Sequence, residues 1–295
     1  MTDPLSALSD ALQARVRAGA GSVAGLAWGG RLRLSAVIWD NASLVTSEQA
    51  LTRDEAVTAI LPGGACVPAV LAGRDPSTNV AALRLEAGAP AIMRPAEPSG
   101  VGAIVLALGS DGAGGATARM ATIEVLGPAW DSQAGGRIDL NLRIGARLPD
   151  PAEGGPVLDA QGGVLGMSTF GPRRGVMVIP AATIARVLPQ LQTAGAVRRG
   201  WLGVGVHPVA LPAALARQAG AEAGLMVVSL AQDSPAAASL LPGDILLAVA
   251  GRKVTSARAL AAALGPETVG QSLELNVLRG GIPATPAVTV AERPA

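Results

Sequence analysis

Few side chains in this sequence could carry out nucleophilic or acid–base chemistry. The sequence contains one histidine, His207, and one cysteine, Cys66, and Lys253 is its single lysine. A Ser–His–Asp triad needs an imidazole that takes the serine proton and returns it to the leaving group. His207 lies in the last third of the chain, so the first two thirds contain no such base. We therefore expect no triad chemistry in the first two thirds.

Carboxylates and the single cysteine and lysine are the remaining candidates for chemistry. Glu48, Asp150 and Glu153 could hold a metal ion, but no histidine accompanies them and their spacing is not diagnostic. Three carboxylates in a solvated loop is the simpler interpretation. Cys66 has no histidine in its own domain to activate it, and a lone cysteine is usually a small buried hydrophobe. A Ser–Lys dyad would need Lys253, which falls on a turn in the last third. We therefore predict no metal site and no cofactor.

The composition favours an aliphatic-rich protein of two or three domains, and the large excess of arginine over its single lysine suggests a GC-rich bacterial genome. Of 295 residues 49% are hydrophobic, yet there are only four Trp, one Phe and no Tyr, so Val, Leu, Ile and Ala must build the core. The formal charge is +1 and no basic run exceeds a pair, which argues against nucleic-acid binding. The longest apolar stretch, Val101 to Leu108, is too short to span a bilayer. No secretory signal is visible, so we expect a cytoplasmic chain as written, or a periplasmic one if it is a trimmed mature form.

The patterning changes twice along the chain. Leu5, Leu8, Leu12 and Val16 recur at helical spacing after an Asp-Pro start, which predicts a helix up to about Arg17. Many short strands follow without alternating helices, which favours a β-barrel or sandwich. The expected strands are Val23–Trp28, Arg31–Trp39, Ala65–Ala72, Val80–Glu86, Ala103–Gly109, Arg119–Leu126, Arg137–Ile144, Pro156–Leu158, Val164–Phe170 and Val176–Ile179. A helix over Ala181–Thr193 should close this part of the chain.

The last third has the pattern of a small α+β module. Expected helices cover Pro212–Ala219 and Ala257–Leu264, and expected strands cover Leu202–Val206, Leu225–Leu230, Ile245–Val249 and Leu273–Leu278. We therefore divide the chain into an N-terminal helix (1–20), a β domain (21–194), a linker (195–199) and a compact C-terminal domain (200–295).

Several motifs resemble bacterial proteins of the HtrA/Deg type. Trp201-Leu-Gly-Val204, Asp233-Ser-Pro-Ala236 and Leu241-Pro-Gly-Asp-Ile245 are similar to the family's PDZ domain. Ala72-Gly-Arg-Asp-Pro-Ser-Thr-Asn79 and Gly154-Gly-Pro156 are similar to its trypsin-like protease domain. The resemblance implies a mainly β protein, a trypsin-like double β-barrel followed by a small α+β PDZ-like domain.

The sequence departs from the family at the positions that carry its chemistry. By the resemblance, the general base is replaced by Gln49, the orienting carboxylate by Asn79 and the nucleophile by Glu153. An oxyanion-hole donor falls on Pro151, which has no N–H. Losing one such donor lowers a rate about a hundredfold to a thousandfold, and losing a nucleophile or base lowers it far more. We therefore expect no enzyme here, but a pseudoprotease without catalytic residues.

With catalysis excluded, peptide binding is the remaining function that the resemblance implies. A PDZ domain adds an extended peptide to a sheet edge beside a helix and captures the C-terminal carboxylate in a loop. By resemblance the loop is Gly200 to Gly203, aided by Arg198 or Arg199, the edge strand is Val204 to Val209, and the helix is Ala257 to Leu264. The predicted peptide-binding residues are Arg199, Gly200, Trp201, Leu202, Gly203, Val204, Val206, Leu260 and Leu264.

The predicted role is thus an adaptor, scaffold or holdase that binds C-terminal peptides or protein clients in this groove. The alternative is a structural or regulatory subunit that assembles with itself, as a trimer, or with an active HtrA-type protease. A residual serine-type endopeptidase is the least favoured interpretation. We expect neither a nucleic-acid partner nor a membrane span.

Overall fold

The computed structural model describes residues 3–51, 57–89 and 93–294. Contacts divide the chain into two compact units. The first comprises Met1–Trp130 and Ile138–Ala196, and the second comprises Asp131–Arg137 and Val197–Ala295. Within the described residues no helix is long and apolar enough to cross a membrane.

Six antiparallel strands close the first barrel, in the order β1-β2-β3-β6-β5-β4. These strands are β1 (Val23–Trp28), β2 (Arg31–Ile38), β3 (Ser43–Ser47), β4 (Val57–Ile60), β5 (Cys66–Asp75) and β6 (Val80–Leu85). Leu26, Ile38, Leu44 and Leu83 are fully buried in its core. The aliphatic core predicted from the scarcity of aromatic residues is therefore present.

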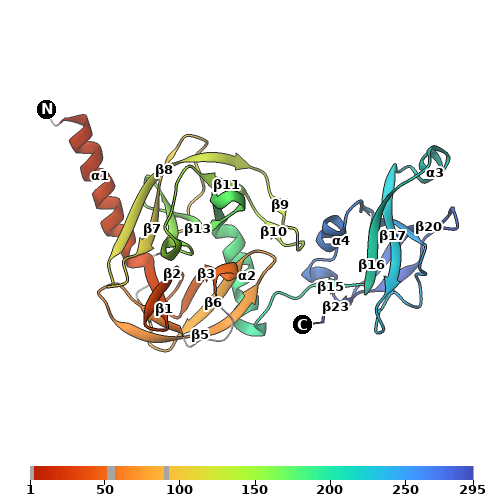
Figure 1. Ribbon diagram of the computed structural model, residues 1–295, viewed down its shortest axis with the longest axis horizontal. Helices are drawn as coiled ribbons and strands as arrows, with labels where there is room; N and C mark the ends of the chain where they lie inside the picture. Colours follow the sequence, from red (N-terminus) through yellow and green to blue (C-terminus); the bar gives the residue numbers. More distant parts are fainter. Residues whose placement is uncertain (1–2, 52–56, 90–92, 295) are drawn as a thin grey trace. The chain divides into compact units, whose positions relative to one another are not determined.

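Six further strands close the second barrel, in the order β11-β14-β13-β12-β7-β8. They are β7 (Ile104–Ser110), β8 (Ala116–Gly127), β11 (Asn141–Ile144), β12 (Pro156–Asp159), β13 (Val164–Phe170) and β14 (Val176–Pro180). In the turn between β12 and β13, the carboxylate of Asp159 accepts hydrogen bonds from the N–H groups of Gln161 and Gly163. The two closed barrels confirm the expected double-barrel fold (Figure 1).

Three strand predictions in this unit were wrong. The sequence predicted no strand over β3, where Ser and Thr break the apolar run, yet all five residues are buried. It also predicted no strand over β4, which pairs with β1 and β5. The expected strand Arg137–Ile144 is interrupted at Asp139. It forms β10 (Arg137–Ile138), which pairs with β9 (Trp130–Asp131), and β11, which belongs to the barrel.

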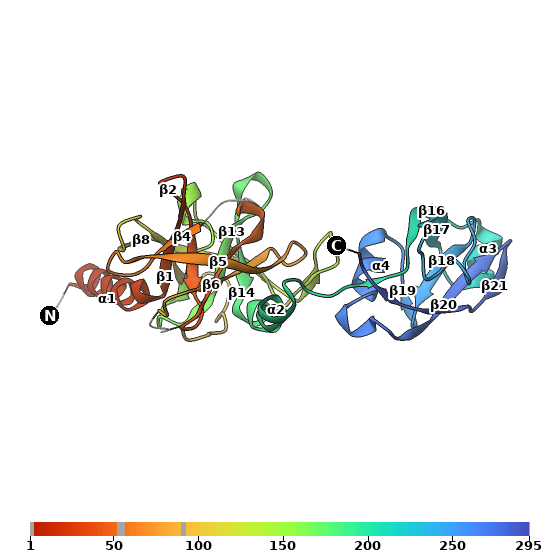
Figure 2. The same cartoon turned by 90° about the horizontal axis from the view of Figure 1, so that it is seen from below.

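Helices flank this unit (Figures 1 and 2). Helix α1 (Pro4–Gly19) begins with the side chain of Asp3 capping the N–H of Ser6, as the Asp-Pro start predicts. Helix α2 (Ala181–Ala194) ends at Gly195 in the left-handed conformation. Ile184, Val187, Leu188 and Leu191 of α2 are buried, which confirms its predicted apolar face. Short 3-10 turns are η1 (Ala20–Ser22), η2 (Glu48–Ala50), η3 (Asp150–Ala152), η4 (Pro172–Arg174) and η5 (Pro266–Thr268).

The C-terminal unit is an α+β domain with its own core. Its main sheet has the order β16-β17-β18-β20-β21, which places β16 at an edge. The elements are β15 (Gly200–Trp201), β16 (Val204–Ala210), α3 (Ala213–Ala219), β17 (Ala223–Leu230), β18 (Ile245–Val249), β19 (Arg252–Lys253), α4 (Ala257–Ala263), β20 (Ser272–Arg279), β21 (Ile282–Ala284), β22 (Ala287–Thr289) and β23 (Ala291–Glu292). The expected strand Leu202–Val206 starts later, at Val204, because Gly203 turns the chain with a φ of +68°.

An ion pair with a buried carboxylate, Asp244, and a partly exposed guanidinium, Arg279, ties the ends of two strands of this domain together. The carboxylate of Asp244 accepts hydrogen bonds from Arg279 Nη2 at 2.7 Å and Nε at 2.9 Å, and from the N–H of Leu241 at 2.9 Å. The side chain of Asp244 is 2% exposed. The Arg279 hydrogen bonds hold the pKa of Asp244 below its usual range, although burial acts in the opposite direction.

Candidate functional site

Gln49 lies where the third strand of the first barrel ends. Strand β3 passes directly into the 3-10 turn η2, which contains Gln49. The backbone N–H of Gln49 donates to Asn79 Oδ1 at 2.8 Å, and the N–H of Glu48 donates to the carbonyl of Asn79 at 3.3 Å. Asn79, in the turn directly before β6, therefore fixes the position of η2.

Asn79 follows a tight turn that Asp75 stabilises. The carboxylate of Asp75 accepts hydrogen bonds from the N–H of Ser77 at 3.1 Å and from Thr78 Oγ1 at 2.7 Å. Asn79 then adopts a φ of +57°, which asparagine tolerates better than most residues. Its side-chain amide donates to Thr169 Oγ1 at 2.7 Å, so it reaches the second barrel.

Glu153 enters the same region from the second barrel. It follows the turn η3, and its own N–H donates to the carbonyl of Asp150 at 3.1 Å. Gly154 then has a φ of +88° and packs so closely on Ser35 and Thr46 that a side chain would not fit. This backbone turn directs the Glu153 side chain inward, where only 6% of the residue remains exposed.

One oxygen of Glu153 collects the hydrogen bonds of this region. Glu153 Oε1 accepts from Ser47 Oγ at 2.8 Å, Gln49 Nε2 at 2.8 Å, Thr169 Oγ1 at 2.9 Å and the N–H of Phe170 at 3.2 Å. Ser47 and Gln49 belong to the first barrel, and Thr169 and Phe170 belong to the second. The structure therefore brings Gln49, Asn79 and Glu153 together, as the resemblance predicts; their equivalence to a triad stays a prediction.

The sequence did not point to Ser47, Thr169 and Phe170 as partners in this cluster. Ser47 ends β3, the strand that went unpredicted, and Thr169 lies inside the apolar run of β13. Both are buried, at 0% and 3% exposed. A polar residue in an otherwise apolar strand was the available signal, because a buried hydroxyl must find a partner.

The three carboxylates do not form the solvated loop that the sequence suggested. Asp150 is exposed and pairs with Arg174, but Glu48 pairs with Arg74 at 3.2 Å and is 12% exposed. Glu153 is buried among hydroxyl and amide donors. That interpretation was therefore wrong for two of the three residues. Within the described residues no group of acidic, histidine or cysteine side chains could hold a metal ion.

Neither Pro151 nor Glu153 has a backbone N–H available to a ligand. Pro151 has no N–H, and its carbonyl accepts a hydrogen bond from Ser35 Oγ at 2.6 Å. The N–H of Glu153 is engaged by Asp150. The exposed polar group beside the carboxylate is the side-chain amide of Gln49.

The C-terminal domain contains a groove of about 410 Å³ between β16 and α4. Its lining includes Gly200, Trp201, Leu202, Gly203, Val204, Val206, Leu260 and Leu264, together with Ala257, Ala261 and Arg293. Eight of the nine predicted peptide-binding residues are in this set, and Arg199 is not. His207 is exposed and does not line the groove.

The loop at one end of the groove has the geometry to hold an anion. In the described part of the chain, the N–H groups of Leu202 and Gly203 donate to no protein acceptor. Gly200 differs, because its N–H donates to the carbonyl of Leu264 at 3.0 Å. Arg198, which was expected to assist the loop, pairs with Glu292 at 2.7 Å. Two backbone donors, not the whole loop, are therefore available.

The remaining reactive side chains lie elsewhere. Cys66 is exposed at the start of β5, which corrects the prediction of a buried thiol. Its Sγ contacts only the carbonyl of Gly64, at 3.7 Å. Lys253 lies on the short strand β19, where Nζ donates to the carbonyl of Gly220 at 3.5 Å.

Comparisons with known families agree with this architecture. Residues 34–167 match the family described as trypsin-like peptidase domain, and residues 200–290 match the PDZ domain family. The solved HtrA-type protease AlgW with decapeptide is similar over 95% of this chain and 98% of its own, with a TM-score of 0.76 and 26% identity.

Curated relatives carry the same arrangement. A probable periplasmic serine endoprotease DegP-like of Brucella suis biovar 1 is 32% identical over 269 residues, which cover 88% of this chain and 52% of the relative. One of the same description from Rhizobium meliloti is 30% identical over 267 residues, covering 85% of this chain and 52% of the relative. The chain spans about half the length of these curated relatives.

These comparisons correct the expectation that the chain is not an enzyme. The relatives are described as serine endoproteases, and the solved neighbour as a protease. The relatives are also described as periplasmic, which agrees with the periplasmic alternative and not with the cytoplasmic expectation. That expectation was based on four substituted positions, Gln49, Asn79, Glu153 and Pro151, which do not by themselves decide activity.

Proposed function

From the premise that the chain consists of an HtrA/DegP-type trypsin-like serine protease domain followed by one PDZ domain, we propose that it captures C-terminal segments of polypeptides. The groove between β16 and α4 is the binding site. Its role is that of an adaptor or holdase for client proteins, and its location is the periplasm, as for the relatives.

The groove provides each contact that such a segment requires. Strand β16 pairs with β17 on one side only, so its other edge can add an extended peptide. The free N–H groups of Leu202 and Gly203 can bind the terminal carboxylate. Leu260 and Leu264 make an apolar wall for the last side chain, which favours a small or medium hydrophobic residue there. The two unpartnered N–H groups beside an apolar wall are the observation that carries the proposal.

A groove-filling substitution tests the site. Ala257 lines the groove at the start of α4, whereas its neighbour Arg258 is exposed and does not line it. Fluorescence anisotropy with a library of C-terminal peptides should detect dissociation constants in the micromolar range. Ala257→Trp should weaken the best binder at least about tenfold, and Arg258→Trp should leave it unchanged. Failure of every library member to bind would contradict the proposal.

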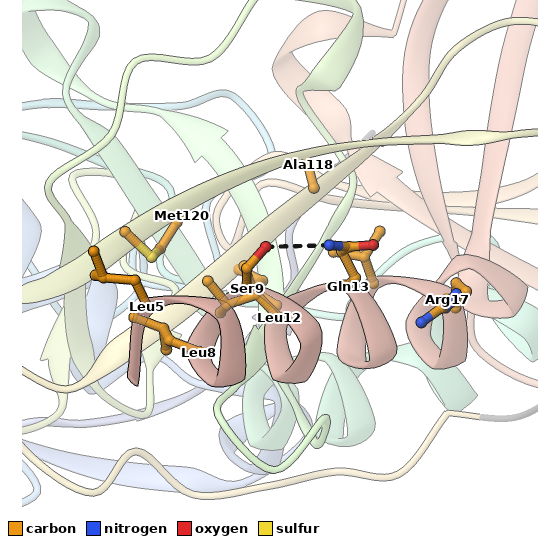
Figure 3. A pocket seen from close by; sticks show the side chains of 10 residues that line it. Leu5, Leu8, Ser9, Leu12, Gln13, Arg17, Ala118 and Met120 are labelled. Atoms are coloured by element: carbon orange, nitrogen blue, oxygen red, sulfur yellow. Dashed lines mark hydrogen bonds between the residues drawn. The ribbon is translucent and has the colours of Figure 1, made fainter. Parts of the chain in front are cut away.

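Self-association is the second candidate, because an apolar surface lies open beside α1. A hollow of about 510 Å³ separates α1 from β8 (Figure 3). Leu5, Leu8 and Met120 face it and remain 75%, 42% and 58% exposed. Contiguous exposed apolar side chains of this kind mark interaction surfaces. A second copy of the chain, or an active HtrA-type protease, would cover them.

The oligomeric state tests this second candidate. Sedimentation of the full chain should show an assembly that Leu5→Ser with Leu8→Ser dissociates. Ser6→Ala, on the exposed face of the same helix, is the control and should leave the assembly intact. A monomer at every concentration, with no co-purifying relative, would exclude it.

A further inference from the structure

We propose that Glu153 and Gln49 form a hydrolytic pair, in which the Glu153 carboxylate activates a water molecule and the Gln49 amide binds the developing oxyanion. The pair would let this chain hydrolyse peptide bonds without a serine nucleophile or a histidine. The inference is independent of peptide capture by the PDZ groove.

The hydrogen bonds of Glu153 are unequally divided between its oxygens. All four donors reach Oε1, and among the described residues Oε2 has no hydrogen-bond partner. The carboxylate plane is therefore held by Oε1, while the lone pairs of Oε2 are free to accept a proton. A fixed carboxylate with one uncommitted oxygen has the geometry of a general base.

Gln49 supplies the electrophilic partner beside this base. Gln49 Nε2 lies 2.8 Å from Glu153 Oε1, 2.9 Å from the carbonyl of Phe170 and 3.0 Å from Thr169 Oγ1. An amide nitrogen has two hydrogens, so these three acceptors already share them. One hydrogen can pass to an oxyanion while the other keeps the amide against the carboxylate. Gln49 is exposed, so a substrate carbonyl can approach it from solvent.

The proposed step needs only water as a co-reactant. The water oxygen attacks the scissile carbonyl carbon while its proton passes to Glu153 Oε2. The carbonyl π electrons move to the oxygen, which accepts the hydrogen bond from Gln49 Nε2. When the tetrahedral intermediate collapses, the C–N bond breaks and Glu153 returns the proton to the leaving nitrogen. The products are a carboxylic acid and an amine, and Glu153 is again ionised.

Casein hydrolysis by the full chain tests the pair. Glu153→Gln keeps the shape of the side chain but cannot take the proton, and Gln49→Ala removes the oxyanion donor. Glu124→Gln is the matched control, because Glu124 is exposed on β8 of the same barrel. We expect Glu153→Gln and Gln49→Ala each to lower the rate about a hundredfold or more, and the control to retain the wild-type rate.

A fluorophosphonate that acylates nucleophilic serines supplies a readout that needs no variant. Treatment of the wild type with this reagent should leave the rate of casein hydrolysis unchanged.

Three results would overturn the proposal. They are no hydrolysis by the wild type, equal hydrolysis by Glu153→Gln, and inactivation by the fluorophosphonate. If Glu153→Gln lowers the unfolding temperature, Gln49→Ala and the fluorophosphonate decide the question.

Discussion

Gln49 Nε2 donates to Glu153 Oε1 at 2.8 Å, and this hydrogen bond joins the first barrel to the second. Around it, Ser47 and Thr169 donate to the same oxygen. The cluster around Gln49 and Glu153 therefore forms a continuous polar network across the barrel interface. The stability of the contact between the two barrels therefore depends on one buried carboxylate.

Removing that carboxylate should destabilise the double-barrel unit. Glu153→Ala leaves the hydroxyls of Ser47 and Thr169 and the N–H of Phe170 without their shared acceptor. Hydrogen bonds to charged groups contribute about 1.5–3 kcal/mol each and are not additive, so we expect a loss of about 2–4 kcal/mol. Calorimetry should show this loss of unfolding free energy in the transition of the double-barrel unit. The control Glu124→Ala should change that free energy by less than about 0.5 kcal/mol. Equal stability of both variants would contradict the role of the network.

Two glycines of the PDZ domain should respond differently to alanine. Gly203 has a φ of +68°, and an added Cβ would lie 2.7 Å from Ser234 Cα. Gly251 has a φ of +76° with no atom within 4 Å of an added Cβ. Gly251→Ala should cost about 1–2 kcal/mol through backbone strain alone. Gly203→Ala should lower the free energy of unfolding, measured by denaturant titration, by more than Gly251→Ala does, and it should weaken peptide binding. Equal losses of unfolding free energy in the two variants, with unaffected binding, would contradict a rigid loop at Gly203.

The Asp244–Arg279 pair should make the stability of the PDZ domain depend on pH. The folded pKa of Asp244 is lowered by the hydrogen bonds from Arg279, relative to an unfolded value of about 3.9. The stabilisation is therefore present above the unfolded pKa and is lost as the pH falls through the folded pKa. The unfolding temperature should drop between about pH 5 and pH 3, and Asp244→Asn should flatten that drop. Parallel pH curves for the two proteins would contradict this assignment.

The periodicity of apolar residues predicted most of the fold. The buried face of α2 follows directly from helical spacing, and β1 follows from a short apolar run bounded by turn residues. Strand β3 was missed because its Ser and Thr side chains are buried by pairing with distant residues, which local patterning does not contain. Cys66 was misplaced for a similar reason, since the sequence does not show which face of β5 meets solvent.

The sequence predicted which residues form the candidate site, but not how their side chains interact. The motifs around Gln49, Asn79 and Glu153 were enough to bring them together. They did not show that Glu153 is buried or that all its donors reach one oxygen, because these features depend on Thr169 and Phe170, far away in the sequence. Likewise, the loop motif predicted the groove, but only the fold shows that the N–H of Gly200 is already engaged while those of Leu202 and Gly203 are free.

The most direct test of the account compares one peptide in two forms. The best C-terminal ligand is titrated into the full chain with a free carboxylate and again with an amidated C-terminus. Because Leu202 and Gly203 offer N–H donors to an anion, we predict micromolar binding of the free acid and at least about tenfold weaker binding of the amide. Equal affinity of the two forms would contradict capture of C-terminal segments in this groove.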